Sequence, residues 1–285
     1  MDEKKTAVIT GCSSGVGFET SILLARNGFR TYATMRNLEK ASRLAELVKK
    51  EGLDLKILRL DVTDEDSVTE SIEKIISETK RVDVLVNNAG FAIFGALEDT
   101  LLDEMKEQFE TNFFGSVRTI QAVLPTMKKQ KKGKIINVSS MVGKFGVPFN
   151  SIYVSTKFAL EGLTESLRYE LHNFCIDVVL VEPGVIKSDF FNNIRLSNKS
   201  RQNSSYSNLL HTRLRGIESM LKNKASSPST VAKEILNIIN SDDSNLRYVV
   251  GEDAVFMTNL KKNLTDEEFE NHMKNTILLG DAYLK

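Results

Sequence analysis

Short runs rich in valine, isoleucine and leucine alternate along the chain with longer stretches that have the apolar spacing of helices. Seven of these runs have the length of strands, at residues 6–10, 30–35, 55–60, 82–87, 134–139, 176–181 and 247–251. Strands without polar alternation are typical of a parallel sheet covered on both faces. Repeated strand–helix units connect through right-handed crossovers. The pattern therefore predicts an α/β fold, a Rossmann-type doubly wound sheet of seven parallel strands with helices on both faces.

The helices expected between these strands span about 16–27, 38–51, 64–80 and 229–240, and a longer helical region after the fourth strand is split near Gly115 or bent at Pro125. Residues 192–228 break this rhythm, because they are polar and rich in Ser and Asn. A segment of this length without elements of its own is expected to be a mobile loop that covers a site. We therefore expect one domain over residues 1–285, with a substrate lid at about 188–228 and a C-terminal extension at about 252–285.

The composition excludes several classes of function. Lys and Arg total 38, as do Asp and Glu, so there is no basic excess of the kind that a nucleic-acid partner requires. Two cysteines and three scattered histidines predict neither a disulfide framework nor a metal site. The N-terminus lacks the apolar stretch of a signal peptide, and no run approaches the length of a membrane span. We expect a cytoplasmic protein with no membrane span.

A glycine-rich segment, TGCSSGVG at residues 10–17, joins the first strand to the first helix. Glycines between a strand and a helix permit a tight turn, a close approach of the backbone to a pyrophosphate, and a helix N-terminus directed at its charge. The spacing differs from the common GxGxxG pattern, and a glycine loop without function is the alternative. Cys12, within this loop, is interpreted as a small filler and not as a redox switch.

A tyrosine and a lysine, Tyr153 and Lys157, lie one helical turn apart, and Ser140 lies thirteen residues before the tyrosine. Residues at i and i+4 share a helix face. A lysine near a phenol favours the phenolate and lowers its pKa, which makes the tyrosine a usable proton donor or acceptor near neutral pH. The alternative is a surface helix that carries the pair by chance.

The segments TGCSSGVG, NNAG (87–90), NVSS (137–140), YVSTK (153–157) and EPGVIKS (182–188) occur here in an order that closely resembles the short-chain dehydrogenase/reductase family, in its compact single-domain branch. The resemblance covers about residues 4–190. Within the family, TYATMRNLEKASRL and TKFALEGLTESLRYEL most resemble the 17β-hydroxysteroid and retinol dehydrogenases and the acyl-dihydroxyacetone-phosphate reductases. The resemblance implies hydride transfer between a nicotinamide cofactor and a carbonyl or alcohol carbon.

The resemblance also implies roles for individual residues. Tyr153 is the acid/base, Lys157 binds the nicotinamide ribose and lowers the tyrosine pKa, Ser140 binds the substrate oxygen, and Asn112 holds a proton-relay water. Ser140 and Tyr153 are thus the expected substrate-binding residues. The residues expected to bind the cofactor are Gly11, Ser13, Ser14, Gly15, Val16, Gly17, Arg36, Asp61, Val62, Asn88, Ala89, Gly90, Tyr153, Lys157, Pro183, Gly184, Ile186 and Ser188.

The end of the second strand indicates which dinucleotide is bound. Met35 stands where an NAD site usually has an acidic residue for the ribose hydroxyls, and Arg36 follows it. A neutral residue followed by a cation suits a 2′-phosphate. We expect NADP(H) to be preferred and NAD(H) to be the lesser cofactor, unless Arg36 is only a solvated surface cation.

The substrate is the least specified part of the prediction. Apolar residues that either line a lipophilic pocket or belong to the core or an interface are Phe91, Phe94, Met141, Phe145, Val147, Phe149, Phe190 and Phe191. The lid carries seven Lys or Arg against two acidic residues over 188–224, which fits an anionic substrate group or a solvated face. The leading hypothesis is an NADP-dependent oxidoreductase of a lipophilic alcohol or ketone (steroid-, retinoid- or acyl-lipid-like). The alternatives are a β-ketoacyl-thioester reductase and a non-catalytic NADP-sensing protein.

Besides this small-molecule partner, a second copy of the chain is expected. The long helices at about 100–130 and 151–172 carry apolar residues beyond those needed to cover one sheet face, among them Phe113, Phe114, Leu160 and Leu167. The family usually pairs these helices, so we expect a homo-oligomer, a dimer or a tetramer.

Overall fold

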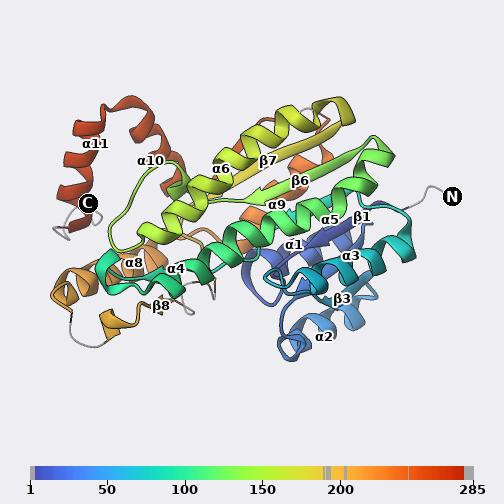
Figure 1. Cartoon of the computed structure of the whole chain (residues 1–285), viewed down its shortest axis with the longest axis horizontal. Coiled ribbons are helices and arrows are strands. Elements are labelled where there is room, and N and C mark those ends of the chain that lie inside the picture. Colours follow the sequence, from blue (N-terminus) through green and yellow to red (C-terminus); the bar gives the residue numbers. More distant parts are fainter. Residues whose placement is uncertain (1–3, 189, 191–193, 202–203, 243, 279–285) are drawn as a thin grey trace.

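A computed structural model describes residues 4–188, 190, 194–201, 204–242 and 244–278, and it contains the predicted sheet (Figure 1). Seven strands pair in parallel in the order β3-β2-β1-β4-β6-β7-β9. The prediction of a doubly wound seven-stranded parallel sheet is confirmed. The strands are β1 (Thr6–Ile9), β2 (Arg30–Met35), β3 (Leu55–Arg59), β4 (Val84–Asn87), β6 (Gly133–Val138), β7 (Ile176–Pro183) and β9 (Arg247–Val250).

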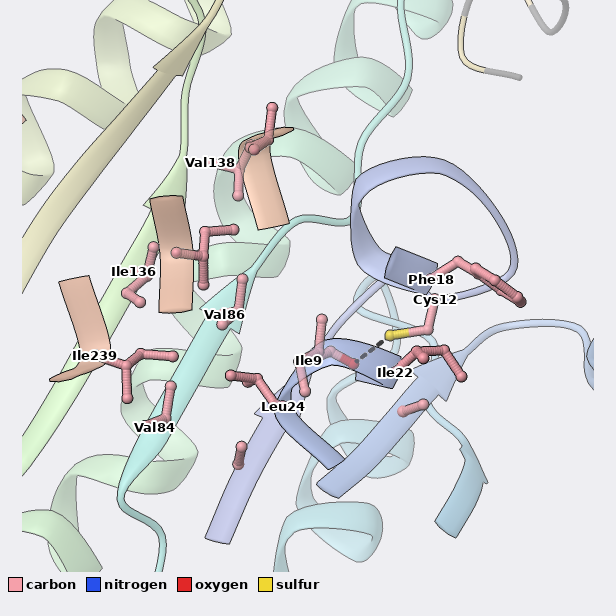
Figure 2. Close-up of a cluster of buried hydrophobic side chains, with 14 of the residues drawn as sticks. Ile9, Cys12, Phe18, Ile22, Leu24, Val84, Val86, Ile136, Val138 and Ile239 are labelled. Atoms are coloured by element: carbon pink, nitrogen blue, oxygen red, sulfur yellow. Dashed lines mark hydrogen bonds between the residues drawn. The ribbon is translucent and has the colours of Figure 1, made fainter. Parts of the chain in front are cut away.

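Two layers of helices cover the sheet. On one face, α1 (Gly15–Arg26), α2 (Ser42–Glu51) and α9 (Pro228–Asn240) pack through a cluster that includes Ile22, Leu44 and Ile235 (part of this cluster is shown in Figure 2). On the other face, α3 (Glu65–Thr79), α5 (Gly115–Gln130) and α6 (Ser151–Leu171) enclose a second cluster with Ile72 and Val123. The strand order reverses between β1 and β4, and in such sheets ligands bind at the carboxyl ends of the strands beside that point.

The helical region after β4 changes its type near Gly115, where a split was expected, and it continues through Pro125. One π-helical turn, Glu110–Phe114, joins α4 (Leu102–Phe109) to α5, and Pro125 lies inside α5. A π-helical turn inserts one extra residue into a helix and is frequent at functional sites. This turn carries Asn112.

The expectation of a long loop at 192–228 is wrong, because much of this region is helical. It contains a short strand, β8 (Arg195–Leu196), which pairs with β5 (Ile93–Phe94), a 3₁₀ turn at Lys199–Arg201, and α8 (Ser207–Asn223). Leu210, Ile217 and Met220 form the buried stripe of α8. The polar residues that suggested a loop are spread over the rest of a helix that buries only a narrow face.

The C-terminal extension is helical as well, with α10 (Glu252–Asn263), α11 (Asp266–Met273) and a final turn at Lys274–Leu278. Met257 and Phe269 pack against Phe145, Val147 and Val154, so the extension covers the region between β6 and the start of α6. Figure 1 places α8, α10 and α11 together at the end of the molecule opposite the N-terminus.

Of the four residues expected at an oligomer interface, Leu160 belongs to the interior and Leu167 is half-buried. Leu160 is only 1% exposed, and Leu167 packs against the cluster beneath α5 and α6. Phe114 is 46% exposed, as is Phe158, which the sequence analysis did not single out. The helix face that remains available to a partner is therefore narrower than the sequence suggested.

A buried polar network joins β4, β6, α5 and α6. The Asn87 amide nitrogen donates to the Asn137 Oδ1 at 2.9 Å, and the Asn137 amide nitrogen donates to the Thr164 hydroxyl at 2.9 Å. The Thr119 hydroxyl donates to the Asn87 Oδ1 at 2.6 Å. Buried polar groups of this kind are costly to leave without partners.

Replacing Asn137 with leucine should therefore lower the stability of the folded protein. The variant leaves the Asn87 amide and the Thr164 hydroxyl without Asn137, and the free energy of unfolding should fall by about 2–4 kcal/mol. Denaturant unfolding at neutral pH measures the change. The matched control is Asn237→Leu at an exposed position on α9, which should change stability by less than about 0.5 kcal/mol. Equal stability of the two variants would contradict the prediction.

Candidate active site

The glycine-rich loop after β1 adopts the conformation that the sequence predicts. Gly11 and Gly15 have φ values of 71° and 60°, in the left-handed region that other residues rarely adopt. Gly17 is required by proximity, because a Cβ there would lie 2.5 Å from both the Asn88 Nδ2 and the Gly11 carbonyl oxygen. The loop therefore leaves the N-terminus of α1 open at the carboxyl edge of the sheet.

Thr10 and Asn88 connect this loop to the end of β4. The Asn88 Nδ2 donates to the carbonyl oxygens of Thr10 and Gly11, at 2.9 and 3.2 Å. In return, the Thr10 hydroxyl accepts from the backbone amides of Asn88 and Ala89, both at 3.0 Å. The NNAG segment thus supports the loop from behind. The role of Thr10 was not predicted, although it directly precedes Gly11.

A cavity of about 570 Å³ opens at this edge, between the glycine-rich loop, the ends of β2, β3, β4, β6 and β7, and the segment with α8. All but two of the residues predicted to form the site line it; the exceptions are Gly17 and Asn112. Residues from positions 11 to 188 therefore meet in one cavity. Those that line it are Gly11, Ser13, Ser14, Gly15, Val16, Arg36, Asp61, Val62, Asn88, Ala89, Gly90, Ser140, Tyr153, Lys157, Pro183, Gly184, Ile186 and Ser188.

Asn112 lies behind the cavity wall, 2% exposed. Its Oδ1 accepts from the Phe91 amide at 3.0 Å, and its Nδ2 donates to the Phe91 carbonyl at 2.9 Å and to the Thr156 hydroxyl at 3.2 Å. The side chain therefore joins the π-helical turn, the segment after β4 and α6. In this arrangement it holds Phe91, which lines the cavity.

Tyr153 and Lys157 lie together as their spacing predicts, and Ser140 joins them as the family resemblance implies. Tyr153 and Lys157 lie on the first two turns of α6, and the lysine Nζ is 5.5 Å from the centroid of the tyrosine ring. The same Nζ donates to the Val138 carbonyl at 2.8 Å. Ser140 lies at the end of β6, where its hydroxyl hydrogen-bonds Tyr153 and also lies 3.4 Å from the Pro183 carbonyl oxygen.

The electrostatics differ from the expectation that Lys157 lowers the pKa of Tyr153. Burial raises the pKa of the Tyr153 phenol above its usual value, and the hydrogen bond with Ser140 opposes this shift. Burial also lowers the pKa of Lys157 to about 8, and the charge of Glu161 opposes that shift. Burial is therefore the largest cause of both pKa shifts.

The loop after β2 presents cations to the cavity. Met35 is buried, whereas Arg36 is exposed and lines the cavity. Lys40, four residues later, also lines the cavity. The sequence analysis missed it, although a second cation four residues after Arg36 could have indicated it. Asp61, after β3, accepts from the Thr63 amide and hydroxyl at 3.1 and 2.8 Å, so its carboxylate orders its own loop.

The apolar residues that the sequence left open are mostly at the cavity. Phe91, Phe94, Met141, Phe145, Val147 and Phe190 line it; Phe149 packs beside them, and Phe191 lies outside the described residues. Sequence reasoning missed Ile217 and Met220 on α8 and Met257 on α10. These three apolar residues stand among polar residues in the sequence, so no local pattern indicated that they line a cavity.

Arg195 closes one side of the cavity and was also missed. Its guanidinium forms two hydrogen bonds with Glu107 on α4, at 2.6 and 2.9 Å, and stacks 5.0 Å from the centroid of the Phe91 ring. The guanidinium holds the pKa of Glu107 below its usual value. Arg195 and Glu107 are 88 residues apart, so no local pattern links them.

Cys12 fills space beneath the loop, as expected (Figure 2). Its side chain is 0% exposed, its thiol donates to the Ile9 carbonyl at 3.2 Å, and burial raises its pKa to about 12. A buried protonated thiol is unreactive. Among the described residues, no group of His, Cys, Asp or Glu side chains has the arrangement of a metal site. No helix within the described residues is long and apolar enough to span a membrane.

Residues 5–199 match the family model described as short chain dehydrogenase. The chain belongs to the short-chain dehydrogenase family. It is 39% identical to 3-ketodihydrosphingosine reductase from Bacteroides thetaiotaomicron over 86% of this chain and 87% of that protein. It is 39% identical to retinol dehydrogenase 8 from Bos taurus, over 86% and 81% of the two chains. Among solved structures, ElxO with NADP bound is similar with a TM-score of 0.74, at 30% identity over 89% of this chain and 99% of that one.

Membership in the short-chain dehydrogenase family makes this chain an oxidoreductase that acts on CH–OH groups. The resemblance seen in the sequence is confirmed, including the similarity to retinol and 17β-hydroxysteroid dehydrogenases.

Proposed function

We propose that this short-chain dehydrogenase interconverts a lipophilic alcohol and its ketone or aldehyde, with NADP(H) as cofactor. The observation that carries the proposal is the single cavity into which the glycine-rich loop, Arg36 and the Tyr153–Lys157 pair all open. A dinucleotide laid along the carboxyl edge from Arg36 would bring its nicotinamide to the tyrosine. The same cavity continues into the apolar wall that α8 and α10 complete.

The glycine-rich loop fits a dinucleotide. Only glycine fits at position 17, and the positive φ values of Gly11 and Gly15 let the backbone approach a pyrophosphate at the N-terminus of α1. Ser13, Ser14, Gly15 and Val16 would contact the pyrophosphate, whereas Asp61 and Val62 would lie beside the adenine. Asn88, Ala89, Gly90, Pro183, Gly184, Ile186 and Ser188 would surround the nicotinamide end.

The bound nicotinamide supplies or accepts the hydride, and the chain's own residues handle the proton. Tyr153 gives a proton to the carbonyl oxygen in reduction and takes it back in oxidation. Ser140 donates a hydrogen bond to the same oxygen as charge develops on it. Lys157 holds a positive charge one turn from the phenol, and Asn112 fixes the segment with Phe91 that borders the substrate. These assignments make Asn112 a positioning residue.

Several observations support a lipophilic substrate. Phe94, Phe145, Val147, Ile217 and Met257 present apolar side chains to the cavity beyond Tyr153. Two relatives of the chain are named for retinol and for 3-ketodihydrosphingosine. We propose that residues 188–228 form the lid over this part of the cavity within a single domain of residues 1–285. The cytoplasmic location stays a prediction of the sequence.

The proposed role of Tyr153 predicts the behaviour of Tyr153→Phe. Loss of the hydroxyl removes the proton donor, so turnover should fall by at least about 100-fold, while NADPH affinity should stay within a few fold. Absorbance at the nicotinamide band, over a panel of ketones and alcohols that includes β-ketoacyl thioesters, measures turnover. Nearly full activity of the variant would refute the role, and a wild type that binds NADPH but turns over no substrate would favour the sensing alternative.

The cofactor preference predicts a response to Arg36→Asp. A charge-assisted phosphate contact contributes roughly 1.5–3 kcal/mol, so NADPH binding should weaken about ten- to a hundred-fold while NADH binding is unchanged or stronger. Fluorescence titration of both cofactors measures the preference. Lys49→Asp is the matched control, because it makes the same charge change at an exposed position on α2 outside the cavity. Equal affinity of the wild type for NADH and NADPH would contradict the assignment.

We also propose that the protein is a homo-oligomer, with α4, α5 and α6 at the interface. Phe114 and Phe158 are each 46% exposed on these helices, and Phe113 packs edge-on against Phe114 at 5.1 Å between centroids. Multi-angle light scattering at micromolar concentration should show a dimer or a tetramer. The double variant Phe114→Glu/Phe158→Glu should be a smaller species, whereas Val255→Glu on α10 should not change the mass. A monomeric wild type would refute the proposal.

A further inference from the structure

A cluster of buried charged groups lies next to Lys157. Glu161 follows it by four residues on α6, so both side chains lie on one helix face, and they are 5% and 6% exposed. Glu182 on β7 is 1% exposed. Arg247, on the neighbouring strand β9, joins the two carboxyls: its Nε lies 2.9 Å from the Glu161 Oε2 and 3.1 Å from the Glu182 Oε1.

In this cluster, two buried carboxyls, those of Glu161 and Glu182, share one guanidinium, that of Arg247. Glu165, on the next turn of α6, also pairs with Arg247, but its side chain is 47% exposed. Lys144, in the loop after β6, is the other cation that acts on Glu182. Two buried carboxyls this close cannot both ionise without mutual repulsion, so one proton is best shared between them.

Glu161 also touches the turn that carries Ser140. A Cβ at Gly143 would lie 3.1 Å from the Glu161 Oε1 and 2.8 Å from the Ser139 hydroxyl oxygen. The Gly143 amide donates to the Ser140 carbonyl at 2.9 Å, which closes this turn. The buried Glu161 Oε1 has no hydrogen-bond partner among the described residues. The Glu161 carboxyl therefore borders the Ser140 turn on the helix face that also carries Lys157, and its Oε1 can accept or carry a proton.

We propose that Glu161 is a positioning residue whose carboxylate keeps the Lys157 ammonium charged, and that Glu161 and Glu182 share one proton. The inference rests on the proposed function, because it acts through Lys157. The buried carboxyls of Glu161 and Glu182 thereby take part in the reaction although neither residue lines the cavity.

The electrostatics agree with this geometry. Burial, followed by the charge of Glu161, raises the pKa of Glu182 to about 7. Burial lowers the pKa of Lys157 to about 8, while the Glu161 carboxylate favours the ammonium. As pH rises through this range, the pair loses its shared proton and gains a negative charge. That charge holds the proton on Lys157 where burial would otherwise remove it.

The first test is the pH profile of Glu161→Gln in ketone reduction with NADPH. Without the carboxylate, the ammonium is lost at lower pH, so the alkaline limb of kcat should move down by about one pH unit. KM for the ketone should stay within about twofold, because the residue does not touch substrate. Glu165→Gln is the matched control: it removes the exposed partner of the same Arg247, and its alkaline limb should match the wild type. An unshifted limb in Glu161→Gln would overturn the proposal.

The second test needs no activity and uses Glu182→Gln, which mimics the protonated carboxyl. The pKa of Glu182 is higher in the folded than in the unfolded protein, where it is about 4.3. The wild type therefore loses stability as pH rises between these two values, whereas the variant has no such group. The Tm of the variant minus that of the wild type should increase from pH 5 to pH 8. A constant difference would refute the shared proton.

These experiments distinguish a failure of the proposed function from a failure of the role of the glutamates. If Tyr153→Phe retains turnover, the proposed function fails, whatever the glutamate variants show. If Tyr153→Phe is inactive and the alkaline limb of Glu161→Gln coincides with that of the wild type, only the role of the glutamates fails. Should Glu161→Gln not fold, Glu161→Asp decides instead: its carboxylate is one methylene shorter, so the alkaline limb should move part of the way to lower pH, and a limb at the wild-type position would overturn the role.

Discussion

Burial of the parallel sheet on both faces constrains the rest of the molecule. Because helices cover the two faces, the loops at the carboxyl ends of the strands are where polar side chains can converge on a ligand. The glycine-rich loop, Asn88, Ser140 and Gly184 follow β1, β4, β6 and β7 in this way. The cavity is thus a consequence of the strand order, with its cofactor half beside the reversal between β1 and β4.

The start of α6 is the second element on which the site depends. It places Tyr153, Lys157 and Glu161 on successive turns, so a phenol, an ammonium and a carboxylate are aligned from the cavity into the interior. Lys157 and Glu161 are buried and Tyr153 is half-buried, and each depends on a polar neighbour: the Ser140 hydroxyl, the Val138 carbonyl and the Arg247 guanidinium. Low exposure makes the charge state of each group sensitive to the others.

The part of the cavity that we assign to the substrate is built from later and less regular parts of the chain. Phe94, Leu210, Ile217 and Tyr153 belong to or pack against one apolar cluster, and Met257 and Phe269 close another. Ionic contacts such as Arg195 with Glu107 attach the lid segment to α4. Such exposed pairs contribute little to stability individually, which suits the proposed role of this segment as a lid. The sequence therefore indicates the reaction class more clearly than the substrate, because the reaction class depends on motifs at the strand ends and the substrate depends on these later segments.

The sequence by itself determined the sheet, the glycine-rich loop and the Tyr153–Lys157 pair, because strand periodicity, glycine spacing and the i, i+4 rule act over short distances. The place of Ser140 beside this pair followed from the family resemblance. Only the tertiary structure decided that residues 207–223 form a helix, that Leu160 is internal, and that a π-helical turn holds Asn112 behind the wall. It also decided the raised pKa of Tyr153 and the Glu161–Glu182 pair, since burial and contacts between distant strands set them. Long-range packing leaves no periodic signature in the residues that it joins.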